Sequence, residues 1–223
     1  MKQRALFFPS SPTFTRKNYV VGACNGDAFR VLEAWPAWGA FGTLIVGEAH
    51  SGKTHLCHTF LESHTEALYL NGHTCAAQHP FDLNESIFIL DDVEHASETW
   101  LFHFFNHAKD NGSYFILTMS QHYQNWCKLP DLCSRLATLP LLTLNLPDDA
   151  LMLAHLKKNL TDRGVSVDSS VLSYLVQHID RSYASVEHWV NVLERLSAEQ
   201  KRNITIAFVR GILNDQSSLE LSS

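Results

Sequence analysis

The sequence has few of the features that mark several large classes of protein. Only 18% of its 223 residues are charged and the formal net charge is −6, so no basic surplus is available to attract nucleic acid. No apolar run is long enough to span a bilayer, and no basic segment followed by an apolar stretch marks a secretion signal. We therefore expect no membrane association and no direct sequence-specific DNA binding.

Cysteine is also scarce, and its spacing shows no pairs. Five residues in no recognisable disulfide or zinc pattern favour reduced thiols and hence a cytoplasmic protein. These cysteines are Cys24, Cys57, Cys75, Cys127 and Cys133.

What the sequence does contain is a phosphate-loop motif, G-x-x-x-x-G-K-[ST], between an apolar run at 43–46 and a helix-like segment at 55–61. When a strand, a glycine-rich loop and a helix follow one another, the successive backbone N–H groups of the loop and the helix dipole can hold anionic oxygens. Lys53 would reach the outer phosphates, and the Thr54 hydroxyl would hold Mg²⁺. The residues predicted to bind nucleotide here are Gly47, Glu48, Ala49, His50, Ser51, Gly52, Lys53, Thr54 and His55.

Polar side chains follow two further apolar runs. Residues 86–90 end in Asp91 and Asp92, and beside a phosphate loop Asp91 would hold the Mg²⁺ shell while Asp92 polarises an attacking water. The alternative is a strand merely capped by acidic turn residues. Residues 114–118 lead to Ser120, which would contact the γ-phosphate or its water unless this segment is a plain loop.

Alternating strands and helices predict an α/β fold with a five-stranded parallel sheet covered on both faces. After Pro147 only helices are expected, and Asp168 is a plausible N-cap for one of them. We expect a flexible tail at 1–13, a nucleotide-binding base at 14–146, a small helical domain at 147–213 and a frayed tail at 214–223. The expected strands cover residues 43–46, 67–70, 86–90, 114–118 and 141–146, and the main helices cover residues 25–35, 100–108, 129–136, 148–162, 169–179, 185–196 and 206–213.

The N-terminal tail carries Gln3 followed by the apolar cluster Leu6, Phe7 and Phe8. A short mobile peptide of this kind can dock by burying its apolar residues in a partner's pocket while the amide fixes the register. From spacing alone, a strand packed on its own domain is an equally good interpretation.

Taken together, these motifs resemble the DnaA family of AAA+ ATPases from about residue 14 to 213. Residues 52–56 and 89–95 are similar to that family's Walker A and Walker B motifs, and residues 129–136 to its Ser-Arg-Leu segment. The resemblance implies a AAA+ base with a helical lid, ADP or ATP with Mg²⁺ as ligand, and an adenine-gripping segment before the phosphate loop. That segment includes Tyr19, Val20 and Val21.

Two features resemble the Hda branch of this family. The chain ends after the expected lid, without the initiator's DNA-binding domain, and the tail resembles the motif by which Hda-type proteins dock on the replicative sliding clamp. The resemblance implies DnaA and the clamp as partners, a homo-oligomer as a further assembly, and a replication inhibitor that stimulates ATP hydrolysis by DnaA. Arg135 would then be the arginine finger that reaches a neighbour's γ-phosphate. A surface arginine paired with Asp131 is the alternative.

The sequence departs from the family pattern at three places. His50 stands where the family usually has glycine, Ala184 or Ser185 where the lid normally supplies a sensor arginine, and Met119 and Ser120 in place of a more acidic segment. These changes favour a nucleotide-bound regulator with at most weak ATPase activity. The alternatives are a helicase loader, a small-molecule P-loop kinase or ATPase, and a binding module that uses nucleotide only for structure.

Overall fold

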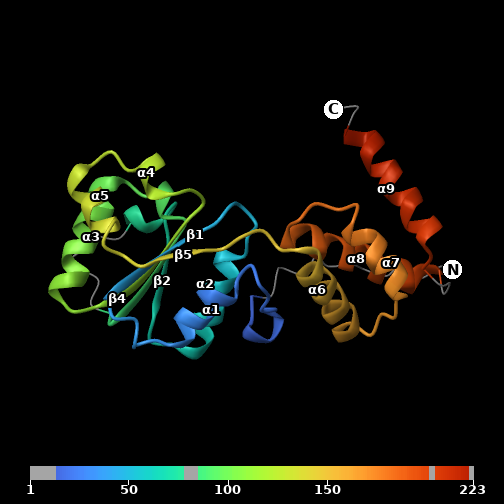
Figure 1. Ribbon diagram of the computed structural model, residues 1–223, viewed down its shortest axis with the longest axis horizontal. Coiled ribbons are helices and arrows are strands. Elements are labelled where there is room, and N and C mark those ends of the chain that lie inside the picture. The colour runs from blue at the N-terminus through green and yellow to red at the C-terminus, as the bar shows by residue number, and fades with distance from the viewer. Residues whose placement is uncertain (1–13, 78–84, 201–203, 221–223) are drawn as a thin grey trace.

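The computed structural model describes residues 14–77, 85–200 and 204–220, which form two parts lying end to end (Figure 1). One part is a sheet flanked by helices, and the other consists of the helices that follow it in the chain. The tail residues predicted to dock on a partner, Gln3, Leu6, Phe7 and Phe8, lie outside the described residues.

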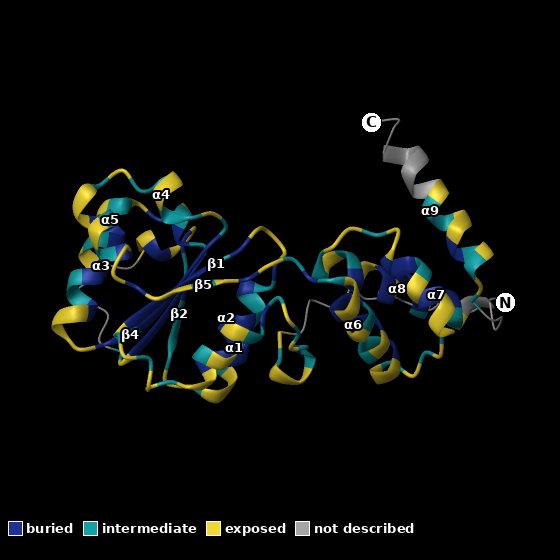
Figure 2. Ribbon diagram, in the orientation of Figure 1, coloured by how far each residue is buried: buried dark blue, intermediate teal, exposed yellow. Residues whose placement is uncertain are grey.

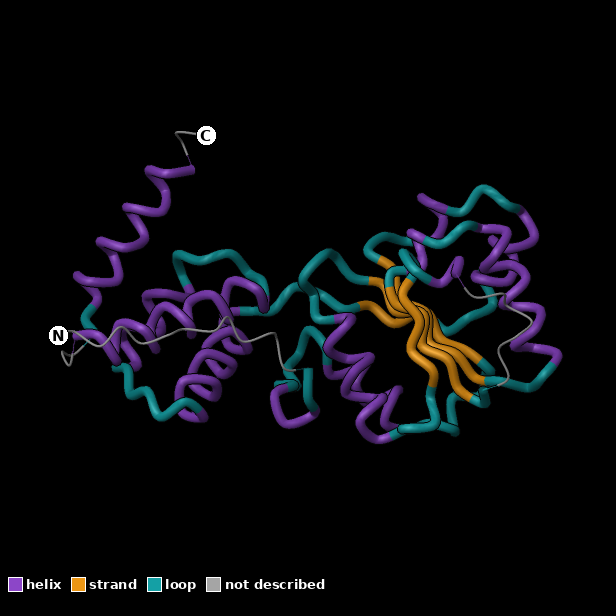
Figure 3. Tube along the Cα trace, turned by 180° about the vertical axis from the view of Figure 1, so that it is seen from behind, coloured by secondary structure: helices purple, strands orange, loops and turns teal. Residues whose placement is uncertain are grey.

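The sheet has five strands, and every pairing in it is parallel, as predicted (Figure 3). The spatial order is β2-β3-β4-β1-β5, so that β1, which leads into the phosphate loop, lies between β4 and β5. The strands are β1 (Gly42–Val46), β2 (Leu68–Asn71), β3 (Ile87–Asp91), β4 (Tyr114–Met119) and β5 (Leu141–Thr143).

Both faces of the sheet are covered, because successive side chains of a strand point to opposite sides. Helices α1 (Gly26–Glu33) and α2 (Lys53–Ser63) cover one face, where Ile45, Ile87, Ile89 and Ile116 share their core. Helices α3 (Glu98–Asp110) and α5 (Pro130–Leu136) cover the other face, where the core includes Leu44, Phe88, Leu90, Phe115 and Leu117. The buried centre of the sheet is visible in Figure 2.

The second part is entirely helical. It comprises α6 (Asp149–Asp162), α7 (Ser169–Val176), α8 (Tyr183–Gln200) and α9 (Ile206–Glu220). Its core of leucines and valines from these helices includes Trp189 of α8. Asp168 caps α7 as predicted, since its side chain accepts a hydrogen bond from the Ser170 N–H at 2.9 Å.

Several element ends differ from the prediction. β5 stops at Thr143, three residues early, and only the Leu144 N–H continues toward the sheet by donating to the Val46 carbonyl. α8 begins two residues before the predicted start, and α9 continues to Glu220, beyond the predicted end at residue 213. The short helices η1 (Arg16–Asn18), η2 (Cys75–Ala77), η4 (Val93–His95) and α4 (Tyr123–Trp126) were not predicted.

The prediction that all five cysteines are free is also wrong, because Cys127 and Cys133 form a disulfide. The chain turns between α4 and α5 and brings their Cα atoms within 5.8 Å, although the two residues are only six apart in sequence. Such a pair follows from the turn rather than from any spacing pattern. Cys24, Cys57 and Cys75 are free.

Over the ranges that the structure describes, no helix has both the length and the apolar character that crossing a membrane requires.

Candidate functional site

The phosphate loop joins the carboxyl end of β1 to the first turn of α2. Gly47 has no room for a side chain, since a Cβ there would lie 2.5 Å from the Leu144 carbonyl oxygen and 2.6 Å from Ser51 Oγ. Gly52, at the N-cap of α2, has φ of 96°, a backbone that glycine adopts without strain. The two glycines of the motif are therefore required by the shape of the loop.

Lys53 is the first residue of α2, and its side chain is buried within the loop. Its ammonium group donates hydrogen bonds to the carbonyl oxygens of Gly47 at 2.8 Å and Glu48 at 3.1 Å. These neutral carbonyls hold a full positive charge at the N-terminal end of a helix, where the helix dipole adds to it. The loop thus presents a concentrated positive potential, which is what a polyphosphate requires.

Asp91 lies at the end of β3 and is 1% exposed. Its carboxylate accepts hydrogen bonds from the hydroxyls of Thr54 at 2.7 Å, Tyr69 at 2.8 Å and Thr118 at 2.5 Å. Thr54 and Asp91, which were each predicted to hold Mg²⁺, therefore lie within hydrogen-bond distance of each other. The two residues offer hard oxygen donors beside the loop, which is the donor set that Mg²⁺ prefers. Among the described residues, no group of three or more His, Cys, Asp or Glu side chains forms a separate metal cluster.

Asp92, the next residue, has a left-handed backbone with φ of 54° and is half-buried. Burial raises the pKa of its carboxyl, and the neighbouring charges of Asp91 and Glu94 raise it further. Glu94 in turn accepts a hydrogen bond from the Ser120 N–H at 2.7 Å, which ties the end of β3 to the end of β4. Sequence analysis did not single out Glu94, although it lies in the same acidic segment as the two aspartates.

The segment before β1 is shaped by Asn25, which is 1% exposed. Its side-chain oxygen accepts from the Gly22 N–H at 2.7 Å, and its amide donates to the Val20 carbonyl at 2.9 Å. Tyr19 lies in the core, with its ring edge-on to His55 at 5.0 Å between centroids. Val21 is 45% exposed. Asn25 lies in the segment that resembles the family's adenine-gripping segment, but its contacts with Gly22 and Val20 were not predicted.

A cavity of about 1340 Å³ opens between the phosphate loop and the helical part. From the sheet side it is lined by Ala49, His50, Gly52, Lys53, Thr54, His55, Asp92, Glu94 and Ser120, together with Phe14 and Asn18. From the helical side it is lined by residues that include His155 of α6, Arg163 at the C-cap of α6, and Tyr183 and Ala184 of α8. Eight predicted site residues therefore line one cavity: Ala49, His50, Gly52, Lys53, Thr54, His55, Asp92 and Ser120. Seven others predicted for the nucleotide or its metal do not line it: Tyr19, Val20, Val21, Gly47, Glu48, Ser51 and Asp91.

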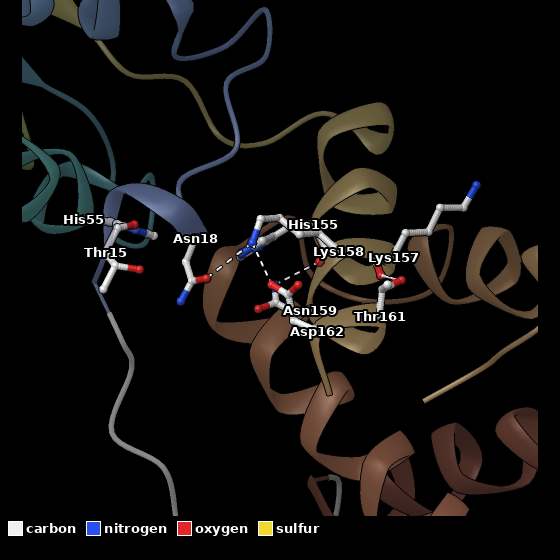
Figure 4. Close-up of polar contacts among 9 residues, drawn as sticks. All are labelled: Thr15, Asn18, His55, His155, Lys157, Lys158, Asn159, Thr161 and Asp162. Atoms are coloured by element: carbon white, nitrogen blue, oxygen red, sulfur yellow. Dashed lines mark hydrogen bonds and ion pairs between the residues drawn. The ribbon is translucent and has the colours of Figure 1, made fainter. Parts of the chain in front are cut away.

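One wall of the cavity joins η1 to α6 (Figure 4). The Lys158 ammonium donates to Asn18 at 3.3 Å and to Asp162 at 2.9 Å, and a His55 ring nitrogen lies 3.0 Å from the Thr15 carbonyl oxygen. Burial lowers the pKa of His155 to about 4, with smaller contributions from His55 and Lys158. His155 is therefore an uncharged ring at neutral pH.

Arg135 does not belong to this cavity. Its guanidinium donates to the Asn106 side chain and lies over the Phe102 ring at 4.6 Å from the centroid, and both partners are on α3. It lines a second cavity of about 450 Å³, whose other residues are Phe41, Phe105, Lys109, Asp131, Ser134 and Thr138. The guanidinium is thus oriented by α3 on a different surface from the chain's own phosphate loop.

Comparison with known proteins shows similarity to replication initiators and a match of the helical part to one family model. Residues 149–213 match the family model described as the Hda lid domain. The chromosomal replication initiator protein DnaA of Anaplasma marginale is 27% identical to this chain. The alignment, 237 residues long, covers 93% of this chain and 50% of the initiator. The chain therefore carries an Hda-type lid and is similar to DnaA initiators over most of its length. It spans about half the length of the curated initiators that it matches.

Solved structures of DnaA share the fold. Domain III of the Thermotoga maritima initiator DnaA superposes with a TM-score of 0.76 at 20% identity, covering 93% of this chain and 98% of that one. The AMPPCP-bound DnaA of Aquifex aeolicus gives a TM-score of 0.73 at 21% identity, covering 86% of this chain and 68% of that one. The predicted AAA+ fold is confirmed, and the helical part is an Hda-type lid.

Proposed function

We propose that this chain is a DnaA/Hda-type AAA+ protein and that it binds ADP or ATP with Mg²⁺ in the cavity between its base, residues 14–146, and its lid, residues 147–213. The observation that carries the proposal is the phosphate loop, in which Lys53 is buried against the loop carbonyls and Thr54 is bonded to Asp91. The nucleotide analogue in the Aquifex aeolicus relative supports the same ligand class.

The residues present fit the metal as well as the phosphates. Thr54 and Asp91 would hold Mg²⁺, which would neutralise phosphate charge. Asp92 and Ser120, at the ends of β3 and β4, would orient a water toward the outer phosphate. A general base works best when its pKa lies near the working pH. The raised pKa of Asp92 is closer to that condition than the pKa of an ordinary carboxyl.

Nucleotide binding is tested by titrating ADP and ATP with Mg²⁺ into the natural chain and into Lys53→Ala, using calorimetry. We expect binding by the natural chain and a loss of at least about 100-fold for the variant, because the buried ammonium supplies the main charge of the loop. Lys109→Ala, an exposed lysine of α3, is the control and should bind normally. Absence of binding by the natural chain would overturn the proposal.

At the level of the cell we infer a regulator of replication initiation of the Hda type. It would dock on the sliding clamp through Gln3, Leu6, Phe7 and Phe8, and present Arg135 to ATP bound by DnaA. The guanidinium is already oriented by Asn106 and Phe102. A planar cation positioned in this way neutralises transition-state charge, and such groups contribute roughly 10³-fold or more to the rate.

The regulatory activity is tested by following ATP turnover by DnaA in the presence of DNA-loaded clamp. The natural chain should accelerate it, and Arg135→Ala should abolish the acceleration while still binding nucleotide. Arg30→Ala, an exposed arginine of α1, is the matched control and should act like the natural chain. Equal acceleration by Arg135→Ala would remove the arginine-finger role.

Clamp docking needs its own experiment, because it rests on the resemblance of the tail. The double variant Leu6→Ala, Phe7→Ala should no longer be retained on immobilised clamp, whereas Leu6 and Phe7 in the natural chain should hold it there. Retention of the variant would show that the tail does not carry the contact.

A further inference from the structure

The first residue of α8, Tyr183, reaches across from the lid to the phosphate loop. A Cβ placed on Gly52 would lie 3.0 Å from the Tyr183 ring, so ring and loop are in direct contact. The ring also lines the large cavity beside Lys53 and Thr54. It is therefore the lid side chain that lies against the Gly52 turn of the loop.

The hydroxyl of Tyr183 is held in a fixed place. It accepts a hydrogen bond from the buried Asn25 amide at 3.2 Å, and Asn25 also fixes Gly22 and Val20 of the segment before β1. Because the hydroxyl acts as acceptor in this bond, its own hydrogen remains to be donated. Burial, together with Cys24, raises the pKa of Tyr183, so the hydroxyl keeps that hydrogen at physiological pH.

The ring is held from the lid side too. His155 of α6 lies edge-on to it at 5.3 Å between centroids. Since His155 is uncharged at neutral pH, this is an aromatic contact between two neutral rings. Tyr183 is therefore positioned by three separate elements: α6, the Gly52 turn and the segment before β1.

We propose that Tyr183 is a nucleotide-binding residue supplied by the lid, which donates a hydrogen bond from its hydroxyl to a phosphate or sugar oxygen of the nucleotide held by the phosphate loop. The inference rests on the proposed nucleotide site. It adds that the lid contributes a hydrogen-bond donor to an oxygen that ADP and ATP share, in the sugar or in the α- or β-phosphate. Loss of the hydroxyl should consequently weaken ADP and ATP to the same extent.

The test compares the natural chain with Tyr183→Phe, which keeps the ring and removes only the hydroxyl. Calorimetric titration with ADP and with ATP should give dissociation constants about tenfold higher for the variant, in the range expected for one lost hydrogen bond to a phosphate or sugar. Titration with pyrophosphate separates the two acceptors: an equal loss assigns the phosphate, and an unchanged affinity assigns the sugar. Tyr174→Phe on α7 is the matched control, since its hydroxyl accepts from Arg210 outside the cavity.

The possible failures are distinguishable. If the natural chain binds no nucleotide, the proposed function itself fails. If the natural chain binds and Tyr183→Phe binds equally well, Tyr183 has no role in binding, even if the variant melts at a lower temperature because the bond to Asn25 is lost. A loss for ATP that greatly exceeds the loss for ADP would place the acceptor on the γ-phosphate, which ADP lacks, and would overturn the assignment to an oxygen that both nucleotides share.

Discussion

At the scale of single residues, two residues of the site have a backbone conformation that most residues avoid. His50 has φ of 64° and Asp92 has φ of 54°, both in the left-handed region. The proteins that the phosphate loop resembles usually have glycine at position 50. Glycine suits this position because it adopts the left-handed conformation without steric cost. The side chain of His50 is exposed and lines the cavity.

We predict that His50→Gly stabilises the chain by about 1 kcal/mol, the steric cost of a left-handed residue that carries a Cβ. The expected rise in melting temperature is about 2–4 °C for a chain of this size. His50→Ala is the control, since it removes the imidazole but keeps the Cβ and should give no rise. Equal melting temperatures for the glycine and alanine variants would show that the backbone at residue 50 is not strained.

The raised pKa of Asp92 predicts that the stability of the folded chain depends on pH. Its pKa in the folded chain is raised, chiefly by burial, so the folded state binds the proton more tightly than the unfolded state. Its ionisation therefore lowers stability as the pH rises from the unfolded pKa through the folded pKa, and the cost is absent at lower pH. Asp92→Asn should melt above the natural chain at pH 7 and lose that advantage at pH 3. Asparagine also tolerates the left-handed backbone, so the comparison isolates the charge.

This prediction is tested by measuring the melting temperatures of the natural chain and of Asp92→Asn at pH 3 and at pH 7. A difference between Asp92→Asn and the natural chain that is the same at pH 3 and pH 7 would show that the carboxyl does not titrate with a raised pKa. Glu66→Gln, an exposed carboxyl beyond the end of α2, is the control and should show no advantage at either pH.

At the scale of elements, the predictions succeeded where a pattern is local. β3 and β4 were found as apolar runs because helices cover both faces of the sheet, and the phosphate loop was found because its chemistry needs fixed residues at fixed spacing. β5 was overextended because an edge strand of three residues, mostly exposed, carries little pattern of its own. The four-residue α4 is too short to show a helical period.

The contacts that sequence analysis missed are those between distant parts of the chain. Asn25 and Tyr183 are 158 residues apart and meet only once the lid is folded against the base. The Cys127–Cys133 bond is close in sequence, but it depends on the turn between α4 and α5. Neither contact produces a pattern in the spacing of residues, so neither could be predicted from this sequence alone.

The disulfide gives a prediction at this scale. It closes a short loop just before Arg135, and the loop-closure entropy that it removes from the unfolded chain is worth roughly 2 kcal/mol. Reduction with a dithiol should therefore lower the unfolding free energy by about that amount in denaturant titration. The double variant Cys127→Ser, Cys133→Ser should melt like the reduced chain and should not respond to reductant. Equal stability of the oxidised and reduced chains would contradict this account.

At the scale of the whole molecule, base and lid meet around the cavity through a small set of polar and aromatic contacts. Lys158 of α6 bonds to Asn18, and Tyr183 of α8 lies against Gly52 and bonds to Asn25. A ligand in the cavity would touch both parts, so its binding free energy would stabilise the contact between them as well as the loop. Nucleotide occupancy and lid position are then linked quantities.

This linkage predicts where a nucleotide should protect the backbone. With saturating ADP and Mg²⁺, amide hydrogen exchange should slow in the phosphate loop and, equally, in the first turn of α8 around Tyr183, because opening of either would first require release of the ligand. Helix α7, which does not line the cavity, is the internal control and should exchange at an unchanged rate. In Lys53→Ala neither region should be protected. Protection confined to the loop would mean that the nucleotide is held by the base alone, and the lid would then be a passive neighbour of the site.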